Sequence, residues 1–182
     1  LAEAEEVISC ILQWCSYYAP ILEQANDRHD LNRQDAHTYV VEHLPHLFHL
    51  LERMLAPKWQ EQLYPAIALF TQKLHNYFQF STPQGLDILK KLLSFIQQQK
   101  NRSLEGLITE RQADLLRRTG QLPQALDLYA QAESLYRQEQ DNLGLANSLR
   151  SRALEHLSSH NYEYALDFLF PALPLYVSEH QP

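Results

Sequence analysis

The sequence predicts an all-α protein of about eight helices, arranged as stacked antiparallel hairpins. Three observations lead to this fold class. Glycine is scarce, with four in 182 residues, and Leu, Gln, Ala and Glu dominate while runs of β-branched residues are nearly absent. Hydrophobic residues make up 45% and charged residues 20%, which is typical of a packed domain. Segments of the chain also repeat at a fixed period.

The N-terminal third predicts two long helices, at residues 2–26 and 34–55, because apolar residues recur in both at helical spacing. The polar stretch 26–33 joins them and includes Asp27, which, like Asp35, is suited to capping a helix. No repeat pattern covers this pair. We therefore assign residues 1–57 to an N-terminal helical pair of its own.

Internal repetition organises the rest of the chain. Three similar segments lie 40 residues apart, at 82–100, 122–140 and 162–180. The first two share six identities in 19 positions and the last two share seven, whereas unrelated segments share about one. Each is predicted to be the second helix of a hairpin, whose first helices lie at about 58–78, 103–118 and 143–158. This predicts a degenerate repeat at 58–102 and two well-matched repeats at 103–182.

The turns inside these two hairpins carry residues that suit a left-handed backbone. Thr119-Gly120 ends one first helix, and Ser159-His160-Asn161 makes the equivalent turn one repeat later.

The last predicted helix is apolar nearly all round. Three-four spacing assigns its packed face to Tyr162, Ala165, Leu166, Leu169, Leu173 and Tyr176. Further apolar residues are then left uncovered, namely Phe168, Phe170, Leu175 and Val177. Because a repeat array needs a polar capping element, we expect another repeat, a partner or self-association to cover them. Pro171 and Pro174 are expected to kink this helix or shift its register.

Residues 103–180 resemble the tetratricopeptide repeat in their small and aromatic positions. These are Ala113 and Ala153 in the first helices, then Ala125-x3-Tyr129, Ala165-x3-Leu169, Ala132 and Ala172 in the second helices. The sequence departs from the pattern at Thr109 and Leu149, where a tryptophan would stand, and in its period of 40 residues. Such lengthened repeats look like the sensor arrays of bacterial signal-transduction ATPases of the NB-ARC-like type. The resemblance implies a right-handed superhelix.

The resemblance also implies a groove lined by the first helices, which would bind a protein or peptide. Its residues map onto Glu110, Asp114, Arg117, Asn147, Arg150 and Leu154. Their mixed acidic, basic and amide groups suit a peptide backbone, although each could instead be merely solvated. The expected function is a protein–protein interaction module, in a sensor or regulatory segment of a larger signalling protein. The alternative is an autoinhibitory regulator of an attached ATPase or transcription-factor module, which a chain opening on Leu1 favours.

The candidate catalytic and metal-ligating residues of the sequence indicate neither an enzyme nor a bound cofactor. His43, His46 and His49 share one predicted helix, but Pro45 interrupts it and the usual zinc-ligand spacings are missing. We interpret these histidines as the polar side of an amphipathic helix, and a His-dependent metal protein remains a remote alternative. No phosphate-binding glycine loop, nucleophile elbow or His-Glu-x-x-His motif occurs in the sequence.

Charge and hydropathy limit the partners further. The formal net charge of −7 disfavours nucleic acid and anionic lipid, which attract basic faces. No run of 18 apolar residues predicts a membrane span. Cys10 and Cys15 lie on different sides of one predicted helix, which disfavours a disulfide between them and favours a reduced, cytoplasmic setting.

Overall fold

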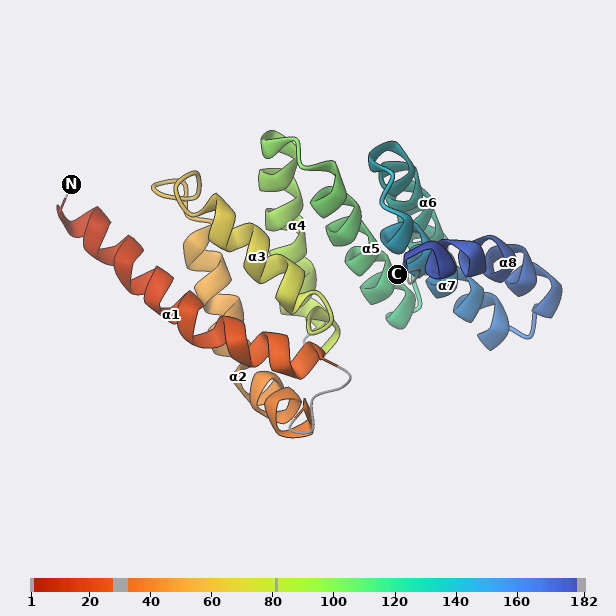
Figure 1. Ribbon diagram of the computed structural model, residues 1–182, viewed down its shortest axis with the longest axis horizontal. Helices are drawn as coiled ribbons and strands as arrows, with labels where there is room; N and C mark the ends of the chain where they lie inside the picture. The colour runs from red at the N-terminus through yellow and green to blue at the C-terminus, as the bar shows by residue number, and fades with distance from the viewer. Residues whose placement is uncertain (1, 28–32, 81, 180–182) are drawn as a thin grey trace. The chain divides into compact units, whose positions relative to one another are not determined.

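The computed structural model describes residues 2–27, 33–80 and 82–179, and the regular structure in these ranges is entirely helical (Figure 1). This confirms the all-α fold class. The described residues form eight α-helices and one 3₁₀-helix: α1 (Ala2–Asn26), α2 (Arg33–Met54), α3 (Tyr64–Leu74), η1 (Phe78–Phe80), α4 (Thr82–Gln99), α5 (Arg102–Arg118), α6 (Leu122–Glu139), α7 (Asn142–Ser158) and α8 (Tyr162–Glu179). Residues 28–32 of the predicted polar connection and His180 lie outside the described residues.

Two compact units make up the chain, Leu1–Leu92 and Leu93–Pro182. The division falls inside α4, whereas the sequence suggested divisions after residues 57 and 102. Each unit is described by itself. Among the described residues, no helix is both long enough and apolar enough to cross a bilayer.

The first unit has a core of aliphatic and aromatic side chains. In it α1 packs against α2 and α3. Leu22, Val40 and Ile67 are fully buried, and the rings of Phe48 and Phe78 stack with their centroids 5.4 Å apart. Burial of such side chains is the main stabilising term for helices of this length.

α3 is shorter than the sequence predicted. A helix was expected at 58–78, but residues 55–63 form turns and the helix spans Tyr64–Leu74. Pro65 lies in its first turn, where a proline fits best because no intrahelical N–H is lost there. The indole Nε1 of Trp59 donates to the carbonyl of Arg53 at 2.6 Å and holds the turn segment in place.

The second unit contains two hairpins, in which α5 packs along α6 and α7 packs along α8. Both first helices begin on a capping side chain, since Asn101 accepts from the Leu104 amide at 3.0 Å and Asp141 from the Gly144 amide at 2.8 Å. Both hairpin turns contain a left-handed residue, Gly120 with φ 79° and His160 with φ 58°. The predicted helix bounds in this unit are therefore confirmed to within one or two residues.

Helices α2 and α8 do not end at their internal prolines, so the expectation that Pro45 interrupts its helix is wrong. α2 continues through Pro45, and α8 continues through Pro171 and Pro174. All three prolines are exposed, and so are Asp167 and Phe170, whose carbonyls lose their usual donors in α8. Water can satisfy those carbonyls, which limits the cost of each proline.

The packed face of α8 also differs from the predicted one. Ala165 and Ala172 are buried, and Phe168, Leu175 and Tyr176 pack near them against α7. The expectation that Phe168 and Leu175 are uncovered is wrong. Tyr162, Leu166 and Leu173, which were expected to pack, are instead 60%, 47% and 63% exposed.

Candidate protein-binding surfaces

Tyrosine hydroxyls of the second helices fix polar side chains of the first helices. Tyr136 donates to Glu110 Oε2 at 2.9 Å, and Tyr129 donates to Asp114 Oδ1 at 2.6 Å. In the second hairpin Tyr176 donates to Asn147 Oδ1 at 2.8 Å. Three of the six residues predicted to line the groove are therefore held in place by hydrogen bonds inside the unit.

Glu110 is buried, with 1% of its surface exposed, so the prediction that it faces an open groove is wrong. The Arg111 guanidinium lies 3.5 Å from its Oε1 atom. Burial raises the pKa of Glu110, although the positive charge of Arg111 and the hydroxyl of Tyr136 act in the opposite direction. The side chain belongs to the interior of the unit and is not available to a ligand.

Asp114 is half-buried and uses both carboxylate oxygens within the unit. In addition to Tyr129 it accepts from the Arg111 guanidinium at 2.6 Å. Burial of Tyr129 and the neighbouring Asp114 carboxylate raise the pKa of the Tyr129 hydroxyl, so this hydroxyl remains a donor. Asp114 therefore serves to position its neighbours.

Two ion pairs connect α7 to the first hairpin. Arg117 of α5 lies 3.7 Å from Glu155, and Arg152 of α7 lies 3.0 Å from Glu133 of α6. Glu133 is 4% exposed, so this pair is shielded from solvent. The Arg152 guanidinium also lies 4.1 Å from the centre of the Phe168 ring, a favourable cation–π arrangement.

Close packing reinforces the contact between α6 and α7. The ring of Tyr136 lies against Gly106 of α5 and Gly144 of α7. A Cβ atom added at Gly144 would lie 2.4 Å from a carbon of that ring, closer than van der Waals contact allows. Glycine at this position is what lets α7 approach α6.

The other three predicted groove residues keep accessible surface, and we call them the α5–α7 face: Arg117, Arg150 and Leu154. Leu154 is 45% exposed, and Arg117 keeps 30% of its side chain exposed beside Glu155. Arg150 is exposed and makes no hydrogen bond or ion pair among the residues that the structure describes. Its charge does act on the buried Glu110 and lowers the pKa of that carboxyl group.

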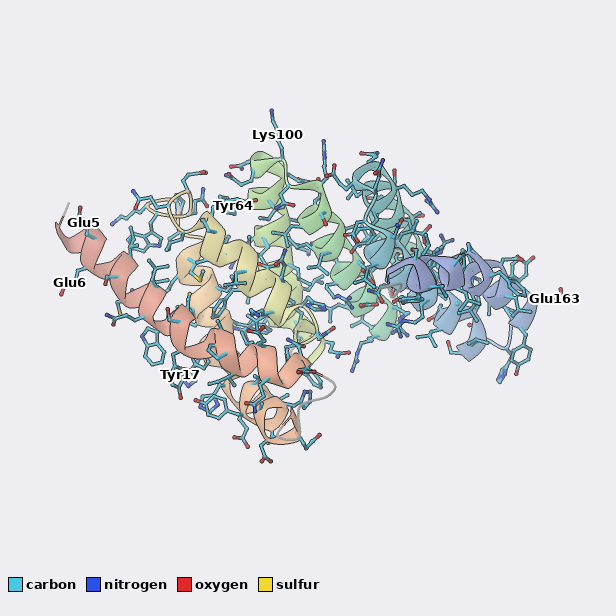
Figure 2. All side chains as sticks on the ribbon, viewed as in Figure 1. Glu5, Glu6, Tyr17, Tyr64, Lys100 and Glu163 are labelled. Atoms are coloured by element: carbon cyan, nitrogen blue, oxygen red, sulfur yellow. The ribbon has the colours of Figure 1, made fainter. Side chains whose placement is uncertain are left out.

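A second surface lies along α8, whose first residues include Glu163, labelled in Figure 2. Of the set predicted for self-association or a continuing array, Phe170 and Val177 are 70% and 50% exposed. Together with Leu166 and Leu173 they form an outward apolar surface, which we call the α8 face.

The first unit contains a groove of about 1400 Å³ between α1, α2 and the turn after α2. Aromatic and imidazole rings dominate its lining: Trp14, Tyr17, Tyr39, His43, His46 and Trp59. The Tyr17 hydroxyl, on a side chain labelled in Figure 2, lies 3.1 Å from that of Tyr39, and the Tyr39 ring stacks on His43 with a centroid separation of 3.9 Å. Within the described ranges no three His, Cys, Asp or Glu side chains converge as metal ligands.

Sequence reasoning missed this groove. Trp14 and Tyr17 lie one turn apart and are about half exposed, at 50% and 54%, and such a pair of large aromatic side chains on one helix was the available signal.

Comparison with models of known protein families, with curated proteins and with solved structures finds no match to this chain.

Proposed function

We propose that the protein is an interaction module that binds a protein or peptide on the α5–α7 face and catalyses no reaction itself. The observation that carries this proposal is that Arg150 and Leu154 lie one turn apart on α7 and are both exposed. The first offers a guanidinium that makes no hydrogen bond or ion pair within the described residues, and the second has 45% of its surface exposed. A partner segment with a carboxylate and an apolar side chain would complement both.

The support beneath this face favours a binding role. Asp114 accepts hydrogen bonds from both Tyr129 and Arg111, so α5, which carries Arg117 of this face, loses little freedom when a ligand binds. Arginine is also enriched among residues that dominate binding energy, because it combines a fork of donors with apolar contact.

The same polar groups argue against catalysis. Glu110 and Asp114, the two carboxylates predicted to line the groove, are each bonded to a tyrosine of α6 and lie near Arg111. A general acid or base has to reach a substrate, and neither side chain is exposed enough to do so.

Membership of the tetratricopeptide family, right-handed stacking of the hairpins, and a sensor or regulatory place in a larger signalling protein remain predictions of the resemblance. In the autoinhibitory alternative, a module of the same parent chain would occupy the α5–α7 face. Both versions require Arg150 and Leu154 to make the contact.

Selection of displayed peptides on the purified chain tests this proposal. We expect enriched peptides that carry acidic and apolar residues one helical turn or less apart. Their affinity should fall at least 10-fold for Arg150→Glu, because a carboxylate then faces a carboxylate. Lys90→Glu is the matched control, since it makes the same charge change at an exposed residue of α4.

Peptides that bind Arg150→Glu and Leu154→Ser as tightly as the unaltered chain would remove the proposal. A loss of affinity with Lys90→Glu as large as that with Arg150→Glu would reduce the effect to net charge, and would also count against this face.

A further inference from the structure

The internal repeat provides a template for what covers α8. Helix α6 is covered by α7, and α8 is the counterpart of α6 one repeat later. Glu133 of α6 is 4% exposed beneath α7, whereas its counterpart Leu173 of α8 is 63% exposed. The surface of α8 that corresponds to the α7-binding surface of α6 is thus open in the described residues.

The charged residues that bind α7 in the first hairpin are replaced by leucines in the second. Arg117 and Glu133, which pair with Glu155 and Arg152 of α7, correspond to Leu157 and Leu173. Leu157 is 37% exposed, so both leucines are accessible. A helix that binds here as α7 binds the first hairpin would meet apolar side chains at both positions.

The second hairpin also has a tyrosine at the position of the ring that contacts α7 in the first hairpin. Tyr136, which lies against Gly144 of α7, corresponds to Tyr176 of α8. Tyr176 packs against the cluster of Ala146, Leu149 and Ala172 between α7 and α8, and it is only half-buried. A second helix could lie against its free side only if it carried a small residue there.

We infer that α8, together with Leu157, binds an amphipathic helix of another protein in the arrangement in which α7 lies on α5 and α6. The bound helix has a glycine or alanine against Tyr176 and apolar residues eight and eleven positions later against Leu173 and Leu157, the spacing from Gly144 to Arg152 and Glu155. This goes beyond the proposed function, since it uses a different face and does not require Arg150.

A second copy of this chain fits the site poorly. α8 carries the required spacing in Ala165, Leu173 and Tyr176. However, Ala165 is fully buried within its own hairpin, and Ala36 and Ala146, which begin the same spacing in α2 and α7, are buried too, so a folded copy cannot present these small residues. The partner must be a helix whose small and apolar stripe is free.

Two synthetic peptides test the inference. One has the sequence of residues 141–158, and the other has that sequence with Arg152→Leu and Glu155→Leu. We expect the apolar peptide to bind the chain at least 10-fold more tightly by fluorescence anisotropy, because buried charges without partners are costly. Adding Gly144→Leu to the apolar peptide should abolish binding, since the new side chain would collide with Tyr176.

Variants of the chain sharpen the test. Leu157→Arg with Leu173→Glu recreates the charges of the first hairpin, so the preference should invert in favour of the native-sequence peptide. Phe170→Glu is the matched control, because Phe170 is 70% exposed and its counterpart Ala130 stays exposed in α6 beside α7. Helical circular dichroism checks that each variant folds, and all the substituted positions are exposed.

Equal binding of the two peptides, no binding of the apolar peptide, or a loss caused by Phe170→Glu without one caused by Leu173→Glu would each overturn the inference. Dimerisation in sedimentation that Leu173→Glu abolishes would overturn it in favour of a second copy. Arg150→Glu separates this inference from the proposed function, because it should leave binding of the apolar peptide unchanged.

Discussion

The two hairpins of the second unit, α5–α6 and α7–α8, have nearly the same helix lengths and turn geometry but differ in the side chains between their helices. The first hairpin contains buried Glu110 and Glu133, with tyrosines and arginines around them. In the second hairpin the counterparts of these carboxylates are the exposed Arg150 and Leu173. The same positions therefore hold buried carboxylates in the first hairpin and an exposed arginine and leucine in the second.

The two hairpins thus share the small residues at their buried positions, whereas the polar residues differ between them. Ala113, Ala125 and Ala132 are fully buried, and so are their counterparts Ala153 and Ala165, with Ala172 nearly so. Small residues set how closely helices approach, which fixes the backbone. The identity of the next layer of side chains then determines which surface can be covered and by what.

The largest expected difference between the hairpins concerns their equivalent tyrosines. Tyr136→Ala should lower the free energy of unfolding by about 3–5 kcal/mol, because a fully buried aromatic ring is removed. Tyr176→Ala should cost less than half as much, since Tyr176 is only half-buried. Chemical denaturation followed by circular dichroism measures both. Equal losses would show that the second hairpin is packed as tightly as the first.

Exchanging the ionic contact for an apolar one brings the first hairpin closer to the second. Glu133→Leu should destabilise the protein by about 3 kcal/mol, because Arg152 loses a buried partner. Adding Arg152→Leu should restore most of that loss. If the double variant is no more stable than Glu133→Leu alone, the loss does not come from the charge of Arg152 left without its partner.

The close approach of α7 to α6 should be sensitive to a single methyl group. Gly144→Ala is expected to cost about 1–3 kcal/mol through overpacking against the Tyr136 ring. Gly120→Ala is the comparison, since nothing lies within 4 Å of its Cβ position and only the left-handed φ opposes the change, by about 1 kcal/mol. Thermal denaturation of the two variants gives the ranking, and a more stable Gly144→Ala protein would contradict it.

The smallest expected effect is a pH dependence that comes from Glu110 of the first hairpin. Burial raises the pKa of Glu110 above its unfolded value, so the folded protein holds that proton to higher pH. Its contribution to stability is complete below the unfolded pKa and is lost as the pH rises through the folded pKa. Glu110→Gln should flatten this fall in the free energy of unfolding. Arg150→Gln should extend the fall to higher pH, because the Arg150 charge lowers the pKa of Glu110.

Local signals in the sequence predicted the helices of the second unit well. The glycine at 120 acts within a few positions of where it stands, so a pattern identifies the turn that it makes. The start of α3 was mispredicted although Pro65 marked it, because the apolar pattern continues through the preceding turns.

Burial of the groove residues could not be predicted in this way. Glu110 lies at an inward position of its helix, but Tyr136, 26 residues later, determines whether solvent reaches it. The packed face of α8 did have a signal, the three-four-three spacing of Ala165, Phe168, Ala172 and Leu175. This spacing could not be distinguished in the sequence, because hydrophobic residues occur on all sides of that helix.

The left-handed residues Lys100 and Gln140 both have φ 57° and lie 40 residues apart. Each stands one residue before a capping Asn101 or Asp141, so the backbone enters residues 101–140 and leaves them in the same conformation. A duplicated copy of this segment inserted after Gln140 would meet compatible ends at both joins. The chain could thus be lengthened by one hairpin at a time, with the leucines of the α8 face left unchanged.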